Sequence, residues 1–189
     1  MGFFDEIVDA AWLVSEQSDP PSDPAWLGPP CDFVPKRCDL DIEFVRSRDM
    51  SLWMPWAEVF PYGVALTLEV RWAAAQRVAL PVIPGERGRA GLCLGAEFDD
   101  GHRVLATSRR RQSRESPLER TLVVAPLRAR PNLATIEVWL WPLPHVSLTW
   151  VLEWRAQRIR ETAVRWDTSA LSEAASQSQR VWPRPVVAS

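Results

Sequence analysis

The chain has 189 residues, of which 47% are hydrophobic and 24% are charged, and its formal net charge is −2. This length and composition suffice for one substantial core, which argues against disorder throughout and favours one domain with tails. The near-neutral charge argues against a surface built entirely to hold nucleic acid or anionic lipid, since such proteins carry a broad basic excess.

The N-terminal residues 1–17 have apolar side chains at helical spacing, at Phe3, Ile7, Ala10 and Val14, and we expect an amphipathic helical arm there. Residues 18–36 are rich in proline and predict a linker or a strap laid over the surface. We place the folded domain at 37–183 and a short tail at 184–189.

Between these limits the apolar period changes to two, which is typical of half-buried strands. Pro55 predicts an edge position or a bulge, and the sequence from Asp99 to His102 predicts a tight hairpin turn. So many short strands indicate a mainly β fold, an antiparallel β-sandwich or a flattened barrel. The expected strands cover residues 40–46, 51–60, 64–72, 92–98, 103–107, 118–124, 134–141, 147–154 and 161–166.

The C-terminal stretch 167–182 has the pattern of a helix, with Leu171, Ala174, Val181 and Trp182 on one stripe and Pro183 ending it. We expect this helix to pack one face on the sheet.

Four of the chain's eleven tryptophans lie in residues 138–154. Even-numbered positions of 148–154 are large and apolar, which predicts a core-facing side that includes Trp150 and Trp154. If 147–154 pairs antiparallel with 134–141, Trp139 and Trp141 fall on the opposite face, and Glu137 comes near Glu153.

Two interpretations of Trp139 and Trp141 stay open. In one, the C-terminal helix covers them through Val181 and Trp182. In the other, the rings are a binding surface for a protein partner or a sugar-like ligand, because exposed indoles suit both. Trp53 and Trp56 are further candidates for stacking on such a ligand.

Charge is distributed unevenly along the chain. Residues 1–23 carry six acidic and no basic residues, whereas residues 107–130 carry seven arginines, including Arg109, Arg110 and Arg111. The acidic arm can therefore fold back near the arginine loop or dock there on another copy, and the alternative is a solvated loop with a mobile arm. Nucleic acid is an unlikely partner, because RRRQSR lacks interleaved aromatic residues.

No catalytic, cofactor or metal signature is found in the sequence. Adjacent Asp99 and Asp100 would point apart, and the Cys31-x6-Cys38 spacing is not a usual zinc pattern. The glycine-rich segment 85–91 could bind an anion or simply turn the chain. We therefore predict no catalytic residue, no cofactor and no metal ion.

The location of the protein is predicted from three observations. Three cysteines without a Cys-x-x-Cys motif indicate a reducing compartment. The N-terminal stretch is interrupted by acidic residues, unlike a secretory signal, and no apolar run approaches the roughly 20 residues of a membrane span. We expect a cytoplasmic protein with no membrane segment.

The segments WLGPP (26–30), LGAEFDDGHR (94–103), VWLWPLP (138–144) and LTWVLEW (148–154) together resemble an uncharacterised family of small actinobacterial proteins. The resemblance covers roughly residues 25–183. The family's Phe-x-Asp-Gly-Arg hairpin differs here, because Phe98 precedes two aspartates and His102 separates Gly101 from Arg103. The resemblance implies one shared domain and supplies no activity.

The sequence thus favours a non-enzymatic protein-interaction or assembly module, with self-association through the N-terminal arm or with a protein partner. A small-ligand or carbohydrate-binding domain that uses exposed tryptophans is the alternative, and an enzyme of unrecognised type is the third.

Overall fold

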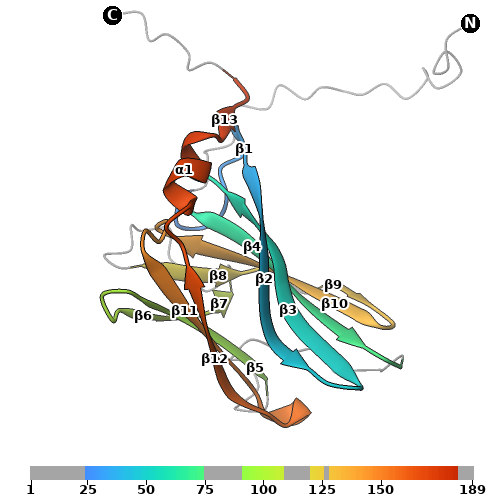
Figure 1. The fold of residues 1–189 in the computed structure, drawn as a ribbon. Helices are drawn as coiled ribbons and strands as arrows, with labels where there is room; N and C mark the ends of the chain where they lie inside the picture. The colour runs from blue at the N-terminus through green and yellow to red at the C-terminus, as the bar shows by residue number, and fades with distance from the viewer. Residues whose placement is uncertain (1–23, 75–90, 109–119, 126–127, 183–189) are drawn as a thin grey trace, which may run out of the picture.

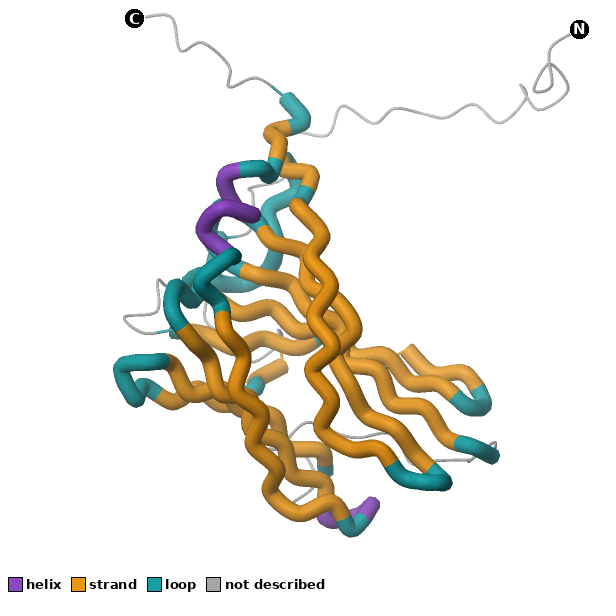
Figure 2. The backbone as a smooth tube through the Cα atoms, in the orientation of Figure 1, coloured by secondary structure: helices purple, strands orange, loops and turns teal. Residues whose placement is uncertain are grey.

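A computed structural model describes residues 24–74, 91–108, 120–125 and 128–182 of the chain. Within these residues the fold is mainly β, with open sheets and one short α-helix (Figures 1 and 2). The elements in chain order are β1 (Phe33–Val34), β2 (Lys36–Arg46), β3 (Met50–Val59), β4 (Val64–Trp72), β5 (Leu92–Phe98), β6 (Arg103–Leu105), β7 (Thr107–Ser108), β8 (Thr121–Val124), β9 (Arg128–Arg130), β10 (Leu133–Trp141), β11 (Ser147–Trp154), the 3-10 helix η3 (Arg155–Gln157), β12 (Ile159–Asp167), α1 (Leu171–Ser176) and β13 (Gln179–Arg180).

The strands form three sheets. The largest has seven strands in the order β2-β3-β4-β10-β8-β7, with β9 also paired to β10. The second has four strands in the order β12-β11-β5-β6, and β1 pairs with β13 in a two-stranded sheet. All described pairings are antiparallel except that of β7 with β8. The mainly β, antiparallel prediction is confirmed, and no described sheet closes into a barrel.

One hydrophobic cluster takes side chains from both large sheets. The even-numbered residues Leu148, Trp150, Leu152 and Trp154 of β11 are each at most 1% exposed, as their alternation predicts. Ile136, Val138 and Leu140 reach the same cluster from β10 in the other sheet. Burial of this apolar surface is the main favourable contribution to folding.

The pairing of 134–141 with 147–154, considered as one possibility from the sequence, does not occur. Strand β10 is bonded to β4, β8 and β9, whereas β11 lies between β5 and β12. Both sides of each strand are thus occupied, and residues 142–146 lead the chain from one sheet to the other. Glu137 and Glu153 are consequently not neighbours, and they pair with Arg128 and Arg155 respectively.

The C-terminal helix is much shorter than predicted. Helix α1 ends at Ser176, and its Leu171 and Ala174 pack on the core as expected. The chain then turns to form β13, and the Val181 N–H donates to the Asp32 carbonyl at 2.8 Å. These strand-type bonds to the β1 segment replace further helical turns. Val181 and Trp182 consequently lie outside the helix and are 44% and 63% exposed.

Two predicted irregularities are present in the sheets. The pairing of β3 with β4 shifts register between Trp53 and Ala57, so Pro55 lies in a bulge of a strand that has neighbours on both sides. Residues 99–102 turn the chain between β5 and β6, and Gly101 there has a φ of +82°. The predicted N-terminal arm, including Phe3, Ile7, Ala10 and Val14, lies outside the described residues, as do Arg109, Arg110 and Arg111.

Candidate binding groove

A row of side chains crosses the outer face of the seven-stranded sheet, on the side away from the shared core. Arg37 is opposite Glu58, Glu58 is opposite Ala65, Ala65 is opposite Trp139, and Trp139 is opposite Val123. The row therefore runs across β2, β3, β4, β10 and β8. Its middle residue is small while Trp139 and Arg37 are large, so the face is hollowed over β4.

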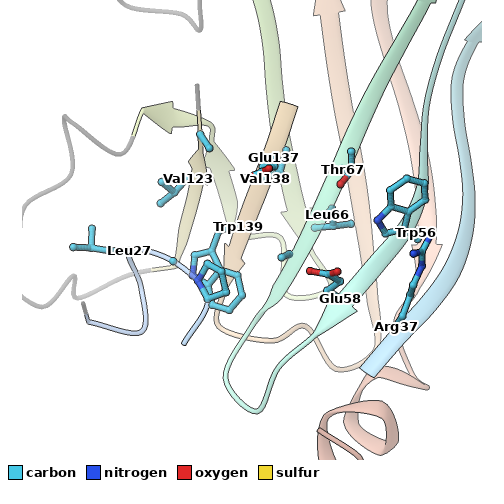
Figure 3. Close-up of a pocket in the computed structure, with 14 residues that line it drawn as sticks. Leu27, Arg37, Trp56, Glu58, Leu66, Thr67, Val123, Glu137, Val138 and Trp139 are labelled. Atoms are coloured by element: carbon cyan, nitrogen blue, oxygen red, sulfur yellow. The ribbon is translucent and has the colours of Figure 1, made fainter. Parts of the chain in front are cut away.

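The hollow is a groove of about 470 Å³ (Figure 3). Thr67 and Glu137, which are opposite each other on β4 and β10, extend its floor by a second row. Trp56 and Arg37 lie on one side of the groove, and Trp139 with Leu27 lies on the other. A volume of this size lies within the range of small-ligand and peptide side-chain sites.

Residues 24–30, here called the strap, form one wall of the groove. The Trp139 indole N–H donates to the Ala25 carbonyl at 2.9 Å, and the Thr121 hydroxyl donates to the Trp26 carbonyl at 3.1 Å. The ring of Trp26 meets that of Trp141 edge-on with centroids 6.2 Å apart. The strap therefore lies against the ends of β8 and β10.

The strap, and not the C-terminal helix, covers the tryptophans of β10. Trp139 is only 4% exposed and packs with Phe60 and Val123 in a second, small hydrophobic cluster. Trp141 is half-buried against the same cluster. The prediction that Val181 and Trp182 cover these rings is wrong, because the chain leaves the helix before reaching them.

The opposite wall of the groove pairs a cation with an indole. The Arg37 guanidinium lies 4.3 Å from the centre of the half-buried Trp56 ring. Glu58, the cross-strand neighbour of Arg37, is exposed, and its carboxylate has no ion pair with any described residue. The second carboxylate of the groove, Glu137, is 3.2 Å from Arg128. The groove thus contains two carboxylates and one guanidinium.

A similar combination of residues lies further along the same face. Glu69 is buried, accepts the Trp53 indole N–H at 3.3 Å and is 2.8 Å from the Arg71 guanidinium. Arg71 also lies over the Trp53 ring at 5.6 Å from its centre. Trp53 and Trp56 were both named from the sequence as candidates for stacking on a ligand. Each ring already has the guanidinium of an arginine of the same chain over it.

Three other titratable groups of the described residues lie outside the groove, and each is defined by its own local contacts. The Asp100 carboxylate binds Arg120 and the His102 N–H, which lowers its pKa to about 2, while Asp99 takes no part in that contact. Burial raises the pKa of the Cys38 thiol, which disfavours the reactive thiolate. His145 Nδ1 and the Ser172 hydroxyl are 3.3 Å apart, both exposed, and no described carboxylate is bonded to that imidazole.

Within the described ranges, no three or more histidine, cysteine, aspartate or glutamate side chains are grouped so that they could hold a metal ion. No helix there has the length and apolar character needed to cross a bilayer. Residues 85–90 of the glycine-rich segment 85–91 lie outside those ranges.

No protein-family model, curated protein or solved structure matches the chain. The resemblance to small actinobacterial proteins therefore stays a prediction. The site is defined by its own geometry alone.

Sequence reasoning named Trp139 and Trp56 but missed the polar residues beside them. Arg37, Glu58, Thr67 and Glu137 are ordinary solvent-facing positions of alternating strands, and only the cross-strand register brings them together. The one usable signal was the small Ala65 between the larger residues of 64–72, because a small outward residue on a central strand leaves space.

Proposed function

We propose that the protein is a non-enzymatic interaction module, a β-sandwich whose outer-face groove takes a short segment of a partner protein that carries a basic side chain. The observation behind the proposal is the groove itself, open on the sheet face and walled by the strap and by Trp56. Interface centres are typically rich in tryptophan and arginine, which line this groove from both sides.

The charge of the groove supports a basic segment. Glu137 is paired with Arg128, whereas the Glu58 carboxylate has no ion pair with a described residue, and the Arg37 guanidinium opposite it lies over Trp56 instead. A partner's ammonium or guanidinium group would gain from a carboxylate that is not already paired with a described residue.

The carbohydrate alternative has less support. Sugar stacking needs the open face of an aromatic ring, yet Trp139 is nearly buried and the ring of Trp56 carries Arg37. The expected stacking surface is therefore already occupied by groups of the same chain.

The proposal is tested with the full chain and blocked tetrapeptides that are basic, acidic, apolar or neutral. We expect isothermal titration to detect binding of the basic peptide, and Ala65→Phe to abolish it by filling the floor. Thr135→Phe is the matched control, because Thr135 lies on β10 outside the groove. Binding of none of the peptides, or equal binding by Ala65→Phe, would overturn the proposal.

Two further outcomes identify the other functions. Binding of a sugar panel that is lost in Ala65→Phe would make the protein a carbohydrate-binding domain and would overturn the peptide proposal. A salt-sensitive dimer in light scattering, unaffected by Ala65→Phe and without peptide binding, would indicate self-association through the arm that contains Phe3 and Ile7 instead.

A further inference from the structure

The outer sheet face has two groups that each combine a tryptophan, an arginine and a glutamate. Around Trp53 all three side chains are in contact, because Glu69 accepts the indole N–H and also binds the Arg71 guanidinium that lies over the ring. Around Trp56 one of these contacts is missing. Arg37 lies over the ring, but it forms no ion pair with Glu58, although the two residues are opposite each other on β2 and β3.

We propose that Trp56 and Glu58 form a subsite for an arginine side chain of the partner, and that Arg37 holds its place on Trp56 until the partner displaces it. This inference rests on the proposed function, since the arginine belongs to the segment that enters the groove.

The ligand chemistry follows from contacts already made on this sheet face. Two guanidinium groups of the chain itself, those of Arg37 and Arg71, lie over tryptophan rings there, at 4.3 and 5.6 Å from the ring centres. A planar cation stacks on an indole and at the same time offers paired N–H donors to a carboxylate. Arg71 uses both kinds of contact, through Trp53 and Glu69.

An incoming arginine can make both contacts, stacking on Trp56 and pairing with Glu58, whereas Arg37 makes only the first. Glu58 lies two residues after Trp56 on β3, so both side chains are on the outer face and both line the groove. A guanidinium that enters from the groove can reach the Glu58 carboxylate from the side of Ala65, because both residues line the groove and are opposite each other. Arg37 is exposed and on the edge strand β2, so it can move into solvent at little cost.

This arrangement makes Arg37 a competitor of the partner. When a group of the same chain occupies a site for part of the time, only the free fraction of molecules can bind the ligand. The apparent affinity is reduced by that fraction. Removal of the Arg37 guanidinium should therefore strengthen binding. Removal of a residue that touches the ligand directly would weaken it.

The test uses the full chain and two blocked tripeptides, Gly-Arg-Gly and Gly-citrulline-Gly, in isothermal titration. Citrulline has the shape of arginine without its charge. We expect the arginine peptide to bind at least about tenfold more tightly than the citrulline peptide, because the charged contact to Glu58 and the stacking on Trp56 both depend on the cation.

Three variants complete the experiment. Glu58→Gln should weaken binding of the arginine peptide about tenfold or more, and Arg37→Gln should tighten it several-fold. Arg71→Gln is the matched control, because it removes a guanidinium over a tryptophan of the same face outside the groove, and it should leave binding unchanged. Thermal unfolding of each variant checks that the fold is retained.

The outcomes separate this inference from the proposed function. Equal binding of both tripeptides, abolished by Ala65→Phe, would overturn the arginine subsite, and the proposed function would then stand only if the basic tetrapeptide binds more tightly than the neutral one. Weaker binding by Arg37→Gln would overturn the displacement of Arg37 and show that it contacts the ligand. No binding of either peptide or of the blocked tetrapeptides would overturn both proposals.

Discussion

The tryptophans of β11 and those of β10 lie in two different environments. Trp150 and Trp154 are between the two large sheets, at most 1% exposed, and belong to the main cluster. Trp139 and Trp141 are on the outer face of the seven-stranded sheet, in or against a small cluster that has three buried members among the described residues.

The difference lies in what covers the rings. The β11 rings pack in the main cluster, to which both large sheets contribute side chains, and the Trp154 ring meets that of Trp72 of β4 edge-on. Trp139 is covered by the strap, which is joined to the sheet by the hydrogen bonds of Ala25 and Trp26. The outer cluster is consequently a local unit, and it also forms one wall of the groove.

The sharpest test of this difference compares Trp150→Ala with Trp139→Ala. We expect a loss in free energy of unfolding of about 3–5 kcal/mol for Trp150→Ala, because it empties the middle of the main core. Trp139→Ala should cost about 2 kcal/mol, since the strap can relax into the space. Urea denaturation measures both values.

Hydrogen exchange shows where each loss occurs. In Trp139→Ala, the Leu27 amide, which donates to Pro24 within the strap, should exchange faster while amides of β11 keep their protection. Equal losses in both variants, with faster exchange in both places, would contradict a separate outer cluster.

A second prediction concerns the turn between β3 and β4. A Cβ atom at Gly63 would lie 2.6 Å from the Leu140 carbonyl oxygen and 2.6 Å from the Trp139 ring. Gly63→Ala should therefore displace Trp139 and cost about 1–3 kcal/mol. Gly95→Ala in β5 is the comparison and should cost less, because its Cβ would meet the Val104 carbonyl at 3.1 Å, a tight contact but a less severe one. A Gly63→Ala protein with unchanged melting temperature would contradict the close packing of Trp139.

The smallest expected effect depends on pH. Arg120 precedes β8, where Thr121 holds the strap, and binds Asp100 in the hairpin of the other sheet. The pKa of Asp100 is lowered from 3.8 to about 2, so its contribution to stability is present above about pH 4 and is lost as pH falls through about 2.

Asp100→Asn isolates this contribution. The difference in melting temperature between the original protein and Asp100→Asn should be constant from pH 7 to about pH 4 and should shrink towards zero near pH 2. If the contact only joins the hairpin to the β8 flank, hydrogen exchange at Leu27 should not change. Faster exchange there would show that the strap depends on this ion pair.

The strands could be predicted from sequence where alternation was clear. The bounds of β4, β5 and β11 agree with the predicted ranges 64–72, 92–98 and 147–154. Pairing was not predictable in the same way, because neighbouring segments such as β10 and β11 look like a hairpin whether or not the chain crosses to another sheet.

The groove and the strap were harder to predict for related reasons. The proline-rich strap has no periodicity from which its partners could be inferred, and Ala25 and Trp26 bind residues far away in the sequence. The helical pattern of the sequence continues from 171 to 182, but the helix ends at Ser176. Gln179 and Arg180 pair with the β1 strand instead, and this pairing could not be inferred from the pattern.

The strap also has a consequence for how the protein is made. Its two hydrogen bonds join residues 95 and 114 positions apart in the chain. A ribosome needs roughly ten seconds to make such a length, and during this time Trp26 and Leu27 have no docking site. The prolines on either side keep the segment from forming a helix or a strand meanwhile. The strap is therefore among the first parts of the described fold to be synthesised, yet it cannot dock until β8 and β10 have been made.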